Sequence, residues 1–250
     1  MQYQVVKNVL RTGLIMALAI IVSGQSAGAQ FWRRTSLRGS GDIISEVRDL
    51  KGFSRIEAGS ASNVYISFGD QWHVEIEADD NVMEYIETGV RRETLFIGMD
   101  NSVRSIGRMT FNVYVTLPEL KVLTASGAAD IIFEDPVSQQ SITLKASGAS
   151  NIKVTVEVDA LEIVTSGASD IDIEGFAHYA EVTASGASDI KGARFECIVA
   201  DVKLSGASDM CAVITEKVTG SLSGASDLRI IGNPEVRVSS SGASSVIAEK

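Results

Sequence analysis

The stretch Ser166-Gly167-Ala168-Ser169-Asp170-Ile171-Asp172-Ile173 decides the fold of this chain, because near-copies of it recur at an almost constant spacing. Seven near-copies of the phrase Ser-Gly-Ala-Ser-Asp begin at Ser126, Ser147, Ser166, Ser185, Ser205, Ser223 and Ser241. Their successive offsets are 21, 19, 19, 20, 18 and 18 residues. A period of this length predicts a solenoid, in which each repeat forms one coil and neighbouring coils share a core.

Apolar and charged residues alternate on both sides of each phrase. After one phrase, for example, Ile171 and Ile173 flank Asp172, and the residues before each phrase follow the same pattern. Alternation with a period of two predicts a strand with one buried face. Each repeat therefore holds two short strands. The phrase between them forms a corner, where glycine permits a bend or a close approach of two backbones.

A single coil has too little apolar surface to fold alone. It must pair with the next coil, at about 4.8 Å per coil, so that equivalent residues stack in columns. The period has no six-residue subdivision of the kind found in left-handed coils, and parallel strands favour right-handed crossovers. The sequence predicts an all-β fold, a right-handed parallel β-helix (solenoid) with about 20 residues per coil.

Residues 41–120 are less regular than the repeats but are still mainly strand. Residues 59–64, Gly-Ser-Ala-Ser-Asn-Val, resemble a degenerate copy of the phrase and predict an early coil. In the strand over residues 72–78, the alternation predicts that Trp72, Val74 and Ile76 face inward.

A short helical turn is predicted over residues 80–87, capped by Asp80 or Asn81. Its apolar side chains would face the end of the solenoid and close the core: Val82, Met83 and Ile86.

Residues 1–29 have the features of a cleaved secretory signal peptide. Lys7 and Arg11 precede an apolar run over residues 14–22, and Ala27-Gly28-Ala29 ends the segment. The alternative, a membrane anchor, is disfavoured because about 10 apolar residues are too few to cross a bilayer, which needs roughly 20. We expect residues 30–40 to be a linker and residues 41–250 to be one domain, irregular over 41–120 and regular over 121–250, with no transmembrane segment in the mature chain.

The charge balance bears on the partners of the mature chain. Loss of residues 1–29 leaves 20 basic and 32 acidic residues, a net charge of −12. Nucleic acid is therefore an unfavourable partner, because its binding depends on basic groups that release counterions from phosphates.

Several separate phrases in the first half of the chain match one known family in order and spacing. They are residues 52–53 (Gly-Phe), 59–66 (Gly-Ser-Ala-Ser-Asn-Val-Tyr-Ile), 78–82 (Ala-Asp-Asp-Asn-Val), 85–88 (Tyr-Ile-Glu-Thr) and 115–120 (Val-Thr-Leu-Pro-Glu-Leu), followed by 126–130 (Ser-Gly-Ala-Ala-Asp). From residue 41 to residue 250 the chain resembles the auto-transporter adhesin head domain, also called the GIN domain. The resemblance implies an exported β-helical protein of the kind found in Bacteroidetes-like bacteria, with no established catalytic residues.

The repeats align a column of acidic residues, which is the most conspicuous polar feature of the sequence. Its members are Asp130, Asp170, Asp189, Asp209 and Asp227, with Asn151 within the column and Ser245 at its end. Neighbouring carboxylates would repel each other by about 1 kcal/mol in water. We expect each Asp or Asn to cap its own turn through backbone amides, a habit of these side chains. The alternative is a row of calcium ions, but the glycine- and aspartate-rich nonapeptide of calcium-binding solenoids is missing.

Other residues with possible chemistry have simpler interpretations. The two histidines, His73 and His178, are too few for a histidine-rich metal site. Cys197 and Cys211 occupy different places in their repeats, so we expect free thiols, although export would permit a disulfide. Residues Phe176 and Phe195 each lie ten residues after a repeat serine, which predicts a stacked pair in the core. We predict no catalytic, cofactor-binding or metal-binding residue and no cofactor.

The sequence thus favours an exported, non-catalytic β-solenoid, an adhesin-like or cell-envelope binding or structural protein. Its partner would be a protein, a glycan or the cell-envelope surface, and its location the periplasm, the outer cell surface or the exterior. The alternative is a polysaccharide-active enzyme, a lyase or hydrolase, because β-helices can carry such sites, although fold alone is a poor reason for that assignment. The edge of the last coil, over residues 246–250, could pair with a second copy to form a homo-oligomer.

Overall fold

The computed structural model describes residues 35–105 and 107–249, which form one compact unit. The chain is nearly all β, with 65% strand and 2% helix. The predicted signal peptide over residues 1–29 lies outside the described residues, and so do residues 30–34 of the predicted linker.

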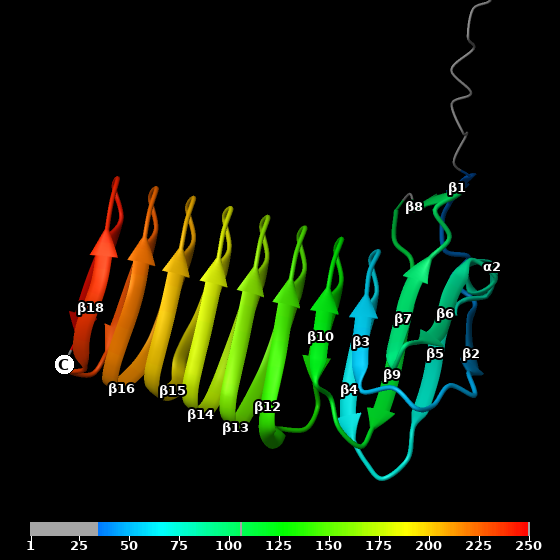
Figure 1. Cartoon of the computed structure of the whole chain (residues 1–250). Helices are drawn as coiled ribbons and strands as arrows, with labels where there is room; N and C mark the ends of the chain where they lie inside the picture. Colours follow the sequence, from blue (N-terminus) through cyan, green and yellow to red (C-terminus); the bar gives the residue numbers. More distant parts are fainter. Residues whose placement is uncertain (1–34, 106, 250) are drawn as a thin grey trace, which may run out of the picture. The chain divides into compact units, whose positions relative to one another are not determined.

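The repeats form stacked coils, with about 7 turns that lie about 19 residues apart (Figure 1). Each coil follows one strand to a corner made by the Ser-Gly-Ala-Ser phrase and returns along a second strand. Successive coils pair in parallel throughout. The predicted parallel β-helix is confirmed.

The strands of the coils form two ladders. The pre-corner sheet contains the strands that lead to the corners: β3 (Arg55–Ala58), β10 (Val122–Ala125), β12 (Val137–Ala146), β18 (Glu235–Ser240) and the second halves of β13 (Asn151–Thr165), β14 (Asp170–Ala184), β15 (Asp189–Leu204) and β16 (Asp209–Leu222). The post-corner sheet contains the strands that follow the corners: β4 (Asn63–Phe68), β11 (Asp130–Phe133), the first halves of β13 to β16, β17 (Asp227–Ile231) and β19 (Ser245–Glu249). The four long strands bend without a break and so belong to both sheets.

The register places equivalent residues directly over one another. Ile171 pairs with Ile152 on one side and Ile190 on the other, and all three are buried. The intervening residues, such as Lys153 and Asp172, pair with each other and are exposed. This confirms the inward and outward positions that the alternation predicts.

The glycine of each corner is required by the close stacking of the coils. Gly167 has a φ of +77°, and a Cβ on it would lie 2.6 Å from the carbonyl oxygen of Gly148 on the preceding coil. The same oxygen accepts a hydrogen bond from the backbone N–H of Ala168 at 2.7 Å. A residue with a Cβ would therefore be strained twice, by its backbone conformation and by the neighbouring corner. The corners form the row of narrow loops along the top of Figure 1.

Residues 59–64 form the corner of the first coil, as predicted. β3 pairs with β10 and β4 pairs with β11, so that Asn63 lies in register with Asp130. Ser60 occupies the glycine position of this corner, with a φ of +65°. Serine is tolerated because, among the described residues, no corner precedes it in the stack. Its Oγ accepts a hydrogen bond from Met99 N at 3.2 Å.

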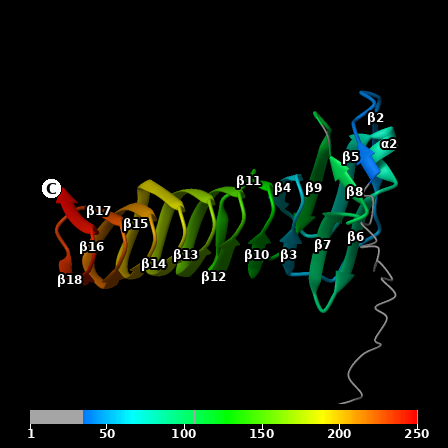
Figure 2. The same cartoon turned by 90° about the horizontal axis from the view of Figure 1, so that it is seen from above.

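Residues 69–121 leave the coil path and form a cap on the first coil. They supply β5 (His73–Asp79), α2 (Asp80–Met83), β6 (Ile86–Arg91), β7 (Thr94–Met99), β8 (Val103–Ser105) and β9 (Phe111–Leu117). β7 pairs in parallel with β3, and β9 with β4, whereas β5 and β6 run antiparallel to β9 and β7 (Figure 2). The chain then rejoins the stack, where Lys121 N donates to Ser54 O at 2.7 Å.

Two details of the predicted cap are wrong. Helix α2 ends at Met83, short of the predicted residue 87, and its N-cap is Asp79, which makes no side-chain cap bond. Trp72 is 40% exposed, because it precedes the first residue of β5 and so lies outside the alternating pleat. Its indole N–H donates to Phe53 O at 2.8 Å. The other inward predictions for the cap are confirmed by burial: Val74, Ile76, Val82, Met83 and Ile86.

The last residues of the predicted linker belong to the fold. β1 (Thr35–Leu37) pairs with β8, and the next strand, β2 (Ile43–Val47), pairs antiparallel with β5. Between these two strands, the backbone N–H of Gly41 donates to Asp79 Oδ1 at 2.7 Å. The backbone N–H of Thr110, just before β9, donates to Asp79 Oδ2 at 2.7 Å. Asp79 is buried, so its carboxylate fastens this arm to the cap. A stretch rich in Gly, Ser and Arg carries no alternation that could have predicted these contacts.

The predicted stack of Phe176 on Phe195 is also wrong. Phe195 is buried in register with Gly175, whereas Phe176 is half-buried in register with Glu196. The pairing of β14 with β15 shifts at an irregularity near Asp172, so equal spacing from the corner no longer means equal register.

Candidate contact face

The outer surface of the post-corner sheet collects the polar residues that the repeats align. The predicted column is present in register over successive coils: Asp130, Asn151, Asp170, Asp189, Asp209, Asp227 and Ser245. Two asparagines extend it into the cap, Asn63 of the first coil and Asn112 of β9. Asn112 lies in no recognisable copy of the phrase, so its place in the column could not be predicted from the sequence.

The predicted role of the acidic column as a set of turn caps is wrong. The corner is instead closed by its second serine, as where Ser169 Oγ donates to Ser166 O at 2.7 Å. The same bond recurs at the other corners that carry this hydroxyl: Ser62, Ser150, Ser188, Ser208, Ser226 and Ser244. The serine makes this bond because its side chain is buried inside the corner. The aspartate that follows it is the first residue of the next strand, and its side chain points outward.

The aspartates bond along the stack rather than within a turn. Asn151 Nδ2 donates to Asp130 Oδ1 at 2.6 Å, and Ser245 Oγ donates to Asp227 Oδ1 at 2.6 Å. Lys191 Nζ donates to Asp170 Oδ2 at 2.7 Å, and this hydrogen bond raises the pKa of Lys191. Amide, hydroxyl and ammonium groups therefore offset part of the repulsion between neighbouring carboxylates. Within residues 35–105 and 107–249, no three His, Cys, Asp or Glu side chains converge as metal ligands would.

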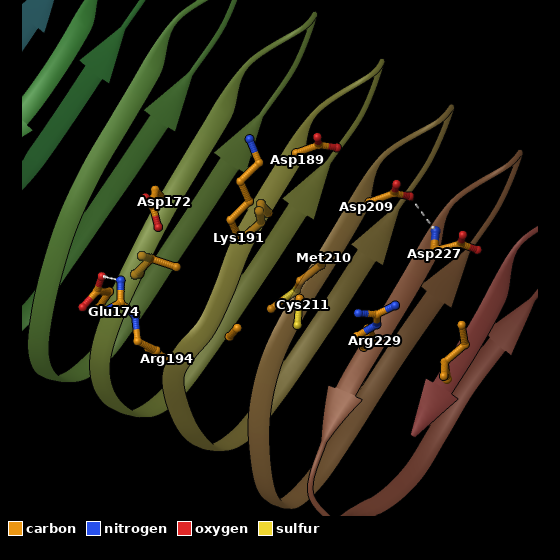
Figure 3. Close-up of a pocket in the computed structure, with 14 residues that line it drawn as sticks. Asp172, Glu174, Asp189, Lys191, Arg194, Asp209, Met210, Cys211, Asp227 and Arg229 are labelled. Atoms are coloured by element: carbon orange, nitrogen blue, oxygen red, sulfur yellow. Dashed lines mark hydrogen bonds and ion pairs between the residues drawn. The ribbon is translucent and has the colours of Figure 1, made fainter. Parts of the chain in front are cut away.

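A shallow groove of about 510 Å³ lies on this face over β14 to β17 and β19. Figure 3 shows Asp189, Asp209 and Asp227 following one another on successive coils, with Cys211 between Lys191 and Arg229. The depression forms where the small Cys211 stands in register between these two long side chains. A second shallow region of about 380 Å³ continues towards the first coil and shares Asp172 and Lys191 with the groove.

An irregularity in β15 adds a further cation to the groove. Gly192 and Glu196 pair with adjacent residues of β16, so residues 193–195 have no partner in that strand. Arg194, one of these residues, forms an ion pair with Glu174. Arg229 Nε lies 3.5 Å from Glu249 Oε1. The groove thus presents acidic and basic groups side by side, a surface suited to polar contacts along its length.

The two cysteines are free, as expected from their different places in the repeat. Burial raises the pKa of Cys197 to about 12. Burial also raises the pKa of Cys211, an effect that Arg229 partly opposes. Since the thiolate is the reactive form, neither thiol is activated as a nucleophile.

The histidines have carboxylate neighbours. His73 Nε2 lies 3.4 Å from Glu75 Oε2, and His178 Nδ1 lies 3.1 Å from Asp159 Oδ1. In the part of the chain that the structure describes, neither histidine has a serine or cysteine hydrogen-bond partner that it could activate.

These features define a parallel β-solenoid with one broad, charged face. The chain belongs to the family described as "Putative auto-transporter adhesin, head GIN domain", whose model matches residues 52–234. The resemblance found in the sequence is thereby confirmed. A comparison with curated proteins finds no match.

Several solved structures share the fold, among them the following three. A "putative adhesin" of Bacteroides fragilis has a TM-score of 0.80 at 21% identity and covers 85% of this chain and 100% of its own. A "putative lipid binding protein" of Parabacteroides distasonis has a TM-score of 0.72 at 16% identity and covers 86% of this chain and 100% of its own. A "putative adhesin" of Parabacteroides merdae has a TM-score of 0.70 at 20% identity, with the same coverage. The described residues include no helix of the length and apolarity that crossing a membrane requires.

Proposed function

We propose that this chain is an exported, non-catalytic adhesin-like solenoid. It contacts a protein, a glycan or the cell-envelope surface through the outer face of its post-corner sheet. Export would follow from the signal peptide predicted over residues 1–29, and would place the protein in the periplasm, on the outer cell surface or outside the cell. Family membership and the adhesin-labelled neighbours support an adhesin-like role.

The observation that carries this proposal is the continuity of the charged face over successive coils. The acidic column and the groove beside it repeat the same kind of group on coil after coil. Contacts of modest strength at several coils act together on one extended partner, because each contact made raises the effective concentration of the next. A catalytic site needs the opposite arrangement, with a few groups converging on one reacting atom.

Binding of the purified chain to glycan arrays and to bacterial cell-envelope preparations tests the proposal. Arg229→Gln and Lys191→Gln remove cations from the groove, and Lys145→Gln on the pre-corner sheet is the matched control. We expect the two groove variants, but not the control, to weaken binding. Equal binding by all three would contradict the role of this face. Turnover of a polysaccharide by the purified chain would instead favour the alternative function, a polysaccharide lyase or hydrolase.

We also propose that the last coil associates with a second copy of the chain. β18 and β19 each pair with one strand of the preceding coil. Among the described residues, no strand covers their other edges, and Val236 of β18 and Ile247 of β19 are exposed. Light scattering over a range of concentrations should reveal a dimer, and a strict monomer at high concentration would reject the association.

A further inference from the structure

A further polar pocket lies where the coils bend from the post-corner sheet to the pre-corner sheet. Its volume is about 530 Å³, within the roughly 300–1,000 Å³ typical of small-ligand sites. Three successive coils line it, each with two outward residues: Ser138 and Gln140, Glu157 and Asp159, Phe176 and His178. The predicted acidic column and the groove beside it contribute none of these residues.

The register explains how residues so far apart in sequence meet. Ser138 pairs with Glu157, and Glu157 pairs with Phe176. The other three residues follow two places later on their strands, and therefore point to the same side. One hydroxyl, one amide, two carboxylates and two rings are thus gathered on one short stretch of surface.

The two rings are held in a fixed arrangement. The centroids of Phe176 and His178 lie 5.0 Å apart with an interplanar angle of 80°, an edge-to-face contact. His178 Nδ1 lies 3.1 Å from Asp159 Oδ1, which places this carboxylate beside the imidazole. Within the described ranges, Nε2 of His178 has no protein partner and remains available to a ligand.

The charge of the pocket narrows the ligand class. Glu157 and Asp159 both line it, and among the described side chains no lysine or arginine forms an ion pair with either. Anionic ligands such as uronates, sialic acids and phosphates would be repelled. A neutral sugar suits the same surface, because its C–H face packs on an aromatic ring while its hydroxyls donate to carboxylates and accept from an amide.

We propose that this pocket, hereafter the bend pocket, binds a neutral carbohydrate. This inference rests on the proposed function, for which it names one ligand class and one site. Phe176 supplies the apolar face, and Asp159 and Glu157 accept sugar hydroxyls. His178 hydrogen-bonds a further hydroxyl through Nε2. The pocket is shallow, so a single site binds weakly, and tight adhesion requires several protein copies on one surface.

Proton NMR of the purified chain tests the proposal directly, because the chain has only two histidines. The ring signals are assigned with a His73→Gln variant. The probes are neutral N-acetylglucosamine oligomers and a neutral galactan, with a polygalacturonate as the anionic comparison. We expect at least one neutral probe to shift the His178 signals while those of His73 stay in place, and the polygalacturonate to shift neither.

Two variants separate ring recognition from a structural effect. Phe176→Leu keeps an apolar side chain but removes the ring, and should weaken binding of the neutral probe about tenfold. Tyr179→Leu makes the same kind of change at an exposed aromatic that does not line the bend pocket, and should leave binding unchanged. Both variants should retain the melting temperature of the parent within a few degrees.

Several results would overturn the inference. They are the absence of any shift of the His178 signals with every neutral probe, an equal shift with the anionic probe, or equal weakening by both leucine variants. If glycan or envelope binding persists, leaves His178 unchanged and is lost in Arg229→Gln, the proposed function stands and the bend pocket is wrong. If no surface or glycan binds at all, both proposals fail together.

Discussion

The regular coils over residues 121–249 and the first part of the fold over residues 41–120 obey different rules. In the regular coils, each corner stacks on an identical corner, so the same residue types recur at each position. In the first part, most strands meet a different kind of neighbour, and only residues 59–64 resemble the repeated phrase. The contrast is clearest at the corner glycine, which is present in all seven repeats but is Ser60 in the first coil. The corner glycine therefore recurs in the regular coils because each of these corners packs against the corner of a preceding coil.

The largest expected difference between the two regions concerns this position. Gly167→Ala places a Cβ 2.6 Å from Gly148 O and forces a left-handed backbone on alanine, so it should cost about 3 kcal/mol of unfolding free energy. The reverse change in the first coil, Ser60→Gly, should alter stability by less than about 1 kcal/mol. Urea denaturation followed by circular dichroism measures both. Similar losses in the two variants would mean that stacking of the corners does not impose the glycine.

The cap should respond to loss of its buried carboxylate. Asp79→Asn replaces one of two acceptors with a donor that faces a backbone N–H, and should cost about 2 kcal/mol. Amide hydrogen exchange should accelerate at Gly41 and Thr110, while the amides of the regular coils remain protected. Asp49→Asn, at an exposed position, is the control. Uniform acceleration along the chain would show that the arm and the coils unfold together.

A smaller effect is expected inside the corners, where the first of the seven repeats supplies a natural variant. Ser169→Ala removes the hydroxyl that donates to Ser166 O and should cost about 1 kcal/mol. The equivalent residue of the repeat that begins at Ser126 is Ala129, which is fully buried. Ala129→Ser should therefore gain up to about 1 kcal/mol if the new hydroxyl reaches Ser126 O. The melting temperatures of the two variants should move in opposite directions, and a shift in the same direction would contradict the assigned role of this serine.

The smallest effect is expected from calcium. The acidic column is already bonded along the stack by amide, hydroxyl and ammonium groups, so millimolar calcium should not change the melting temperature appreciably. Magnesium at the same concentration controls for ionic strength. A rise of several degrees that is specific to calcium would show that the carboxylates hold this ion.

The comparison of the two regions also explains which features could be predicted. Strand alternation and the corner phrase identify the coils, the outward column and the early coil at residues 59–64, because these depend only on local order and on copies of the same neighbour. The exposed Trp72 and the strand β1 depend on unique partners instead. Likewise, the offset of Phe176 from Phe195 depends on a register shift between two particular strands. No local pattern encodes such pairings.

The aspartate column and the bend pocket also differ in how far the sequence could predict them. The aspartate column could be placed from the sequence, but its hydrogen bonds could not, because serine and aspartate are both good turn formers and only burial decides between them. The bend pocket had no signal at all, since its residues come from three coils and belong to no repeated phrase.

By itself, the order of amino acids determined that this chain forms stacked parallel coils, which side chains face the core, and that acidic groups form a line along one sheet. It could do so because the coils of a periodic chain bury one another. Stacking equivalent coils in register is then essentially the one arrangement that pairs the backbone hydrogen-bonding groups and buries the apolar side chains. Only the tertiary structure decided how the cap closes the first coil, which groups neutralise the aspartates, and where aromatic and polar residues meet at the bend. Those outcomes depend on contacts between segments that share no pattern, and such contacts exist only once the chain has folded.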